Sequence, residues 1–225
     1  MATKLWIANG ATMIAFALTL FGGAGTLKWL AAWTFLALFF GLSQALALAM
    51  MRHDPAVLAE RLKSPFQKGQ PLWDKLLLLP LMIMWLCWLV LIGLDAVRYR
   101  WTVMPAWLRL AGVLGLLIGY WIIYRTFREN TFLAAVVRIQ SERGHSVVSS
   151  GPYAIVRHPM YAGAFILIPS IALMLGSWWG VIGSVPILAA ITWRTVMEER
   201  ELRRGLPGYA DYAARVRYRL VPFIW

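Results

Sequence analysis

The sequence has little charge and almost no cysteine. Only 14% of its 225 residues are charged and 60% are hydrophobic, whereas a soluble domain has about 25% charged and about 45–50% apolar residues. This composition argues against a soluble globular protein and against intrinsic disorder, which needs low hydrophobicity. The single cysteine, Cys87, forms no internal disulfide and fits no metal-binding spacing. Its apolar surroundings predict a core or lipid-facing residue.

Acidic residues and the familiar cofactor motifs are also scarce. The sequence contains no Walker A loop, no G-x-G-x-x-G fingerprint, no H-E-x-x-H and no C-x-x-C. Ten acidic residues stand against 22 basic ones, for a net charge of +12. In a soluble protein this excess would suggest nucleic-acid binding. In a chain this hydrophobic, the charges must first be placed relative to a membrane.

Long hydrophobic runs occupy most of the chain. A spanning helix needs roughly 20 mostly apolar residues. Four runs qualify, at about residues 5–22, 30–51, 76–97 and 104–124. A fifth apolar stretch, 161–197, is too long for one span and is interrupted by glycines and tryptophans at 176–180. We therefore predict an all-α polytopic membrane protein with about five spans, in which 161–197 forms a helical hairpin. Whether the hairpin crosses fully stays open.

The charges are distributed unevenly between the two sides. If both termini lie on one side, 18 of the 22 basic residues and nine of the ten acidic residues lie there too; only Asp95 is an acid on the other side. The positive-inside rule places this side in the cytoplasm. The basic excess then orients the protein, and nucleic acid is not expected as a partner.

Two shorter helices are predicted on the charged side. Residues 55–63 carry apolar side chains at helical spacing and suit a helix lying on the membrane surface. Residues 209–219 follow a Gly-Leu-Pro-Gly break and carry Tyr209, Tyr212 and Val216 at intervals of three and four. They predict an amphipathic helix that covers a site or lies on the membrane.

The hairpin begins with a polar pair. Arg157 and His158 precede Pro159, which suits the first position of a helix. A helix N-terminus offers free N–H groups and a partial positive charge, so it favours an anionic ligand group. For an isolated Arg-His pair, however, an ordinary membrane-interface loop is the favoured interpretation.

A second polar group follows the other half of the hairpin. Arg194 and Glu198 are four residues apart and share a helix face, and Glu199 and Arg203 repeat the spacing. A solvated, salt-bridged helix would explain this pattern alone. Because a hairpin returns its ends to one side, His158 and Glu198 can still lie in one site.

Together these residues form a specific motif. It comprises Ser150-Gly151-Pro152-Tyr153, then Arg157-His158-Pro159-Met160-Tyr161-Ala162-Gly163, then Arg194-x-x-x-Glu198-Glu199, and the tail Gly208-Tyr209-x-x-Tyr212-x-x-Arg215-Val216. This combination resembles the isoprenylcysteine carboxyl methyltransferase family, whose wider group includes phospholipid N-methyltransferases. The resemblance covers about residues 130–222, and segment 68–74 is similar to bacterial members.

The resemblance implies an integral-membrane methyltransferase that uses S-adenosylmethionine. Carried over by position, the cofactor pocket would comprise His145, Gly151, Tyr153, Arg157, His158, Tyr161, Glu198 and Glu199. Arg194 and Asn130 would lie near the methyl acceptor, and Glu199 is the candidate base for an amine acceptor. We expect a single membrane domain, with accessory spans and an interfacial loop in residues 1–75 and a catalytic core in 104–225. A bacterial inner membrane is the expected location.

The favoured reaction is methylation of a lipophilic carboxylate, such as a prenylcysteine, to a methyl ester. A carboxylate is already nucleophilic, so positioning and desolvation would dominate catalysis, and Arg194 suits a bidentate clamp. The alternatives are N-methylation of a phospholipid or other amine, an NADPH-dependent reductase of the sterol type, and a non-catalytic membrane protein. The sequence leaves the acceptor and the oligomeric state open.

Overall fold

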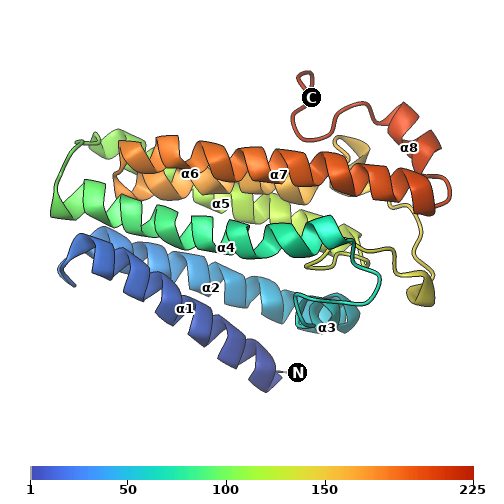
Figure 1. The fold of residues 1–225 in the computed structure, drawn as a ribbon, viewed down its shortest axis with the longest axis horizontal. Coiled ribbons are helices and arrows are strands. Elements are labelled where there is room, and N and C mark those ends of the chain that lie inside the picture. Colours follow the sequence, from blue (N-terminus) through green and yellow to red (C-terminus); the bar gives the residue numbers. More distant parts are fainter. Residues whose placement is uncertain (1) are drawn as a thin grey trace.

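The computed structural model describes residues 2–225 and contains only helices and loops over that range. The long helices are α1 (Ala2–Ala24), α2 (Leu30–His53), α4 (Leu72–Gly93), α5 (Ala106–Glu129), α6 (Pro159–Leu175) and α7 (Trp178–Gly205). The short ones are α3 (Pro55–Arg61), the π-helical η1 (Leu94–Arg98), the 3₁₀ turns η2 (Ser141–Arg143) and η3 (Gly151–Ala154), and α8 (Tyr209–Arg215). The long helices lie roughly side by side in an elongated bundle (Figure 1).

Within residues 2–225, five helices are long and apolar enough to span a membrane. They are α1 from Thr3, α2, α4 together with η1, α5 and α7. Their outer surfaces carry exposed large apolar side chains such as Leu18, Ile83 and Trp121, which would be costly in water but suit lipid. The all-α polytopic fold predicted from the hydrophobic runs is confirmed, and the chain is an integral membrane protein.

The predicted hairpin is formed by α6 and α7. Gly176 adopts a left-handed φ of +85° at the turn, and the Ser177 hydroxyl accepts a hydrogen bond from the Gly180 N–H at 2.7 Å. The halves are unequal, because α7 has 28 residues and α6 only 17. At about 1.5 Å per residue, α6 is roughly 26 Å long, somewhat less than the hydrocarbon thickness of about 30 Å. Only α7 is therefore long enough to cross with residues to spare.

Glycines bring α5 and α6 into close contact. A Cβ atom at Gly112 would lie 2.4 Å from the Met174 amide nitrogen, and one at Gly119 would lie 2.8 Å from the Leu167 Cβ. Small residues at such spacing let membrane helices approach closely. The pair then fixes the end of α5 beside the start of α6, where the polar residues lie.

The opposite end of the bundle is fastened by Asp95, the one acid predicted on that side. Its carboxylate is fully buried and accepts hydrogen bonds from the Ser177 hydroxyl at 2.6 Å and the Trp179 N–H at 3.2 Å. A carboxylate at the N-terminus of α7 also complements the helix dipole. Asp95 therefore stabilises the hairpin turn, and its contacts suffice to explain its burial.

Two short helices differ from their predictions. α3 ends at Arg61, and its Leu58 is buried against Phe127 and neighbouring residues rather than facing lipid. α8 ends at Arg215 rather than at 219. In both cases tertiary contacts outweigh the local pattern. The helix α3 packs on an apolar surface of the protein. The backbone carbonyl groups after α8 accept hydrogen bonds from the residues that precede α6.

Candidate active site

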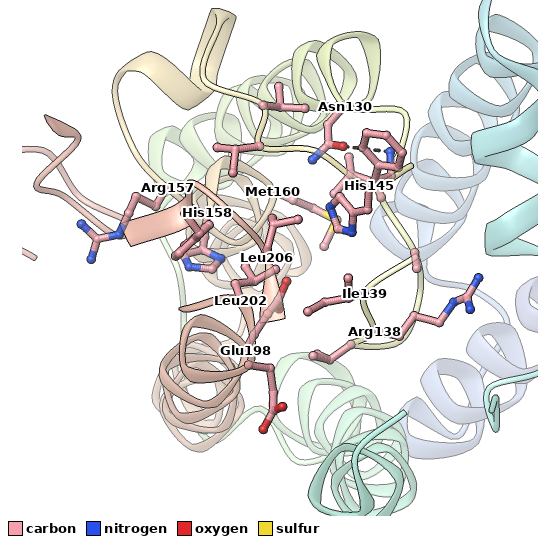
Figure 2. Close-up of a pocket in the computed structure, with 18 of the residues that line it drawn as sticks. Asn130, Arg138, Ile139, His145, Arg157, His158, Met160, Glu198, Leu202 and Leu206 are labelled. Atoms are coloured by element: carbon pink, nitrogen blue, oxygen red, sulfur yellow. Dashed lines mark hydrogen bonds between the residues drawn. The ribbon is translucent and has the colours of Figure 1, made fainter. Parts of the chain in front are cut away.

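A pocket lined by both apolar and polar side chains lies near α8 (Figure 2). Its walls come from the end of α5, the loop 130–150, the start of α6, the last turns of α7, and α8. Eight of the predicted site residues line it: Asn130, His145, Tyr153, Arg157, His158, Tyr161, Arg194 and Glu198. The predicted residues Gly151 and Glu199 lie outside this lining.

His158 points into the pocket from the start of α6 (Figure 2). Its backbone N–H donates to the Arg219 carbonyl at 2.9 Å, which ties it to the C-terminal segment. The side chain is buried, and its Nε2 makes no hydrogen bond with any of residues 2–225. Burial lowers the pKa of His158, so the ring is neutral at pH 7. An uncharged, buried and unpaired nitrogen is thus available to a ligand.

Asn130 and Tyr153 join the end of α5 to the C-terminal segment. The Asn130 Nδ2 donates to the Tyr153 hydroxyl at 2.8 Å, and its Oδ1 accepts from the Phe132 N–H at 2.8 Å. The Tyr153 carbonyl accepts from the Tyr212 hydroxyl at 2.8 Å. Asn130 therefore has a defined orientation at the pocket wall.

His145 lies on the opposite wall from His158 (Figure 2). Its ring stacks on Phe132, with ring centroids 4.5 Å apart, and its Nδ1 accepts from the Gln140 N–H at 3.3 Å. Burial, with the positive charges of Arg143 and Arg138, lowers the pKa of His145 to about 4. The loop 130–150 thus depends on a neutral imidazole.

This dependence predicts an acid-sensitive structure. Because an unfolded histidine titrates near pH 6.5, the contribution of His145 to stability is fully present above that pH. It is lost as the pH falls toward 4, where the unfolded chain binds a proton that the folded site resists. We expect the thermal unfolding midpoint in detergent to fall between pH 7 and pH 4.5, with a shallower fall in His145→Gln. Substitution of the exposed His53 should leave the fall of the unfolding midpoint with pH as it is in the wild type. The same fall in all three proteins would contradict the prediction.

Glu198 is the carboxylate that the pocket leaves available. It accepts a hydrogen bond from the Tyr161 hydroxyl at 2.6 Å, and it forms no ion pair within the described part of the chain. The Tyr161 ring stacks on His158 with centroids 5.9 Å apart. A negative charge beside aromatic faces is an environment that suits a cationic ligand group.

Arg194 lines the pocket, but its partner differs from the one that the spacing predicted. Its Nε donates to Asp74 Oδ1 at 2.9 Å rather than to Glu198, and its Nη2 donates to the Ala135 carbonyl at 3.0 Å. Asp74 is fully buried and also accepts from Gln70 Nε2 and the Val137 N–H. Sequence reasoning assigned Asp74 no role, and the only signal was its place in the bacterial-like segment 68–74.

Glu199 faces away from the pocket, into a cluster of arginines. Its carboxylate pairs with Arg157 at 2.9 Å, with Arg203 at 3.0 Å, and with Arg219. The Arg157 guanidinium also donates to the Val216 and Arg217 carbonyls at 2.6 and 2.8 Å. Figure 2 accordingly shows the Arg157 guanidinium directed away from the pocket. These residues fasten the C-terminal segment over the start of α6.

Gly151 has a structural place beside the pocket. Its φ is +55°, and a Cβ atom there would lie 2.7 Å from the Glu129 carboxylate. The glycine therefore lets η3 turn against the end of α5, and it contributes to the site by placing Tyr153.

Comparison with known proteins agrees with this geometry. Residues 107–206 match the model of the phospholipid methyltransferase family, a range that covers almost all of α5 and the whole of α6 and α7. A search of curated proteins finds no match to the chain. The matched residues include His145, Tyr153, His158 and Glu198, all of which line the pocket. The region from α5 to α7 is thus similar to the phospholipid methyltransferase family, and this match fits the group that also contains the isoprenylcysteine carboxyl methyltransferases.

Proposed function

We propose that the protein transfers a methyl group from S-adenosylmethionine to a lipophilic acceptor. The proposal rests on one observation. Among residues 2–225, one pocket contains both a carboxylate that forms no ion pair and buried polar groups that form no hydrogen bond. The His158 Nε2 and the Tyr209 hydroxyl line this pocket, are buried, and lack hydrogen-bond partners among residues 2–225. Burying such groups is costly unless a ligand satisfies them.

The donor set fits S-adenosylmethionine. This cofactor would supply a methyl group activated by a sulfonium charge, and it also carries an ammonium, a carboxylate and a base. Glu198 would hold a positive charge, with the faces of Tyr153 and Tyr161 beside it. His158, placed just before the first turn of α6, would donate to or accept from the polar groups of the cofactor.

The acceptor that we favour is a carboxylate on a lipid-soluble molecule, such as a prenylcysteine. Arg194 supports this choice, because its Nε and Nη2 are fixed by Asp74 and Ala135 while its guanidinium lines the pocket. An arginine held in this way would orient a carboxylate oxygen, and no base would be needed. Asn130 would help to shape the same wall.

Amine methylation is the second candidate, because the matched family is named for phospholipid methylation. An amine must lose a proton, and the sequence suggested Glu199 as the base. Glu199 lies outside the pocket lining and is paired with three arginines. The neutral Nε2 of His158 is the better placed group for this role.

The positive-inside rule supports a cytoplasmic position for both termini and for the pocket. The start of α1 and the C-terminus both lie toward the end of the bundle that carries α3 and α8 (Figure 1). In a bacterial inner membrane, the cofactor would enter this end from the cytoplasm and the acceptor would come from the bilayer. The accessory spans would then complete a single domain around the catalytic core.

The reaction can be identified by the stability of the product. Membranes containing the protein would be incubated with cofactor labelled in the transferred methyl, and the lipid-soluble fraction would be treated with base. We expect label that base releases as methanol, because methyl esters hydrolyse. Label that resists base would instead establish the N-methyl product. Calorimetry in detergent should show binding of S-adenosylmethionine and not of NADPH; the reverse would overturn the proposal in favour of a reductase.

A further inference from the structure

A second arginine contacts residues of the pocket wall, and it comes from the segment predicted to be accessory. Arg61 is the last residue of α3, and its side chain is half-buried. Its Nη1 lies 3.3 Å from the Ala134 carbonyl oxygen and 3.8 Å from the Met160 sulfur. Both of these residues line the pocket. The guanidinium carbon also lies 4.8 Å from the centre of the Phe127 ring.

The two arginines are held by consecutive residues of one loop. Arg61 donates to the carbonyl of Ala134, and Arg194 donates to the carbonyl of Ala135 at 3.0 Å. Consecutive Cα atoms are about 3.8 Å apart. The two guanidinium groups therefore contact neighbouring positions of this loop, although they are far apart in the sequence. Arg194 lines the pocket itself, and Arg61 lies behind the lining residues Ala134 and Met160.

Arg61 has no carboxylate within 4.0 Å anywhere in residues 2–225. The adjacent Glu60 is buried but pairs with Arg138 at 2.9 Å and Lys63 at 2.5 Å. Asp74 is engaged by Arg194. Arg61 is therefore a cation beside the pocket that has no ion-pair partner of its own among these residues.

The charge on Arg61 persists at neutral pH. Burial and the nearby positive charge of Arg194 lower the pKa of Arg61 to about 10, which still leaves it protonated. A partly desolvated cation without a counterion is unfavourable. An anionic ligand would remove this cost, and guanidinium groups suit oxyanions because of their planar set of donors.

We propose that Arg61 and Arg194 together bind one negative charge on the lipid-soluble acceptor, a carboxylate or a phosphodiester. This site rests on the proposed function, since it defines the acceptor of the methyl group. The two sources differ in their role. A carboxylate would itself receive the methyl group, whereas the phosphodiester of a phospholipid would only anchor the molecule whose amine reacts.

The test compares matched anionic and neutral ligands without turnover. Binding of N-acetyl-S-farnesylcysteine and of its methyl ester would be measured by tryptophan fluorescence on the full-length protein in detergent. We expect Arg61→Met to weaken binding of the acid at least about tenfold, the size of one charge-assisted hydrogen bond, with no change for the ester. Methionine keeps the apolar stem against Phe127. Arg61→Lys should retain much of the affinity, and substitution of the exposed Arg52 by Met should retain all of it.

A second arm replaces these ligands by dioleoylphosphatidylethanolamine and dioleoylglycerol in mixed micelles. If Arg61→Met loses affinity only for the acid, the acceptor is a carboxylate. If it loses affinity only for the phospholipid, the site anchors a phosphodiester. If Arg61→Met affects anionic and neutral ligands equally, or affects neither, in both arms, the anion site is wrong. Cofactor binding is measured separately by calorimetry. A protein that binds the acid through Arg61 but not S-adenosylmethionine would refute the methyltransferase proposal and leave this site intact.

Discussion

Replacing Glu198 by Gln should weaken binding of S-adenosylmethionine about 10- to 100-fold and leave the fold intact. The substitution is isosteric and removes one negative charge from the pocket wall. Glu198 accepts from the Tyr161 hydroxyl and forms no ion pair in residues 2–225, so its charge is not needed to hold the protein together. The expected loss corresponds to an interaction with a charged group of roughly 1.5–3 kcal/mol.

The measurement is isothermal calorimetry on the detergent-purified protein. Asp211→Asn serves as the control, because Asp211 is an exposed carboxylate on α8. Tyr161→Phe should produce a smaller loss, since it frees the carboxylate without removing its charge. Wild-type affinity in Glu198→Gln would show that the cofactor charge is held elsewhere, and it would remove the main support for the proposed orientation.

The spans could be predicted because a membrane imposes a simple rule on the sequence. Backbone polar groups must be satisfied inside the helix, and the apolar runs at 30–51 and 76–97 are long enough to do so. The hairpin was also predictable, since glycines and tryptophans mark the break where Gly176 adopts its left-handed conformation. From this hairpin it followed that His158 and Glu198 could meet, and both line the pocket.

The charge partners could not be predicted, because local spacing is a weak guide for buried groups. The i, i+4 rule suggested Glu198 as the partner of Arg194, but the arginine pairs with Asp74, which is 120 positions away. An exposed arginine can form an ion pair along its own helix with little effect on the stability of the protein. A buried arginine needs a carboxylate that is desolvated with it, and only the fold decides that this carboxylate comes from α4.

The same limit applies to Glu199. Its pairing with Arg203 follows the predicted spacing. Its pairing with Arg157 and Arg219 arises only because the C-terminal segment returns to the start of α6. That return also ends α8 early, since the Val216 and Arg217 carbonyls accept from Arg157 instead of continuing a helix.

Replacing Glu199 by Gln should therefore be the most destabilising of the substitutions considered. The carboxylate is buried and forms ion pairs with three guanidinium groups, of which that of Arg157 is itself buried. Removing one partner of a buried ion pair costs about 3–5 kcal/mol, because the other charge is left uncompensated. We expect a large fall in the thermal unfolding midpoint, measured by tryptophan fluorescence in detergent, and faster proteolysis after α8.

The loss of stability should be larger for the partners whose side chains are more buried. Arg203→Ala removes a partner whose side chain is 45% exposed and should cost little, whereas Arg219→Ala, at 31%, should cost more. Glu142→Gln breaks a pair with Arg138 whose carboxylate is exposed, and it should change stability little. Cofactor binding should fall with Glu199→Gln as well, because the released segment no longer fixes His158 through the Arg219 carbonyl. A Glu199→Gln protein as stable as Glu142→Gln would mean that the arginine cluster is solvated and does not fasten the pocket.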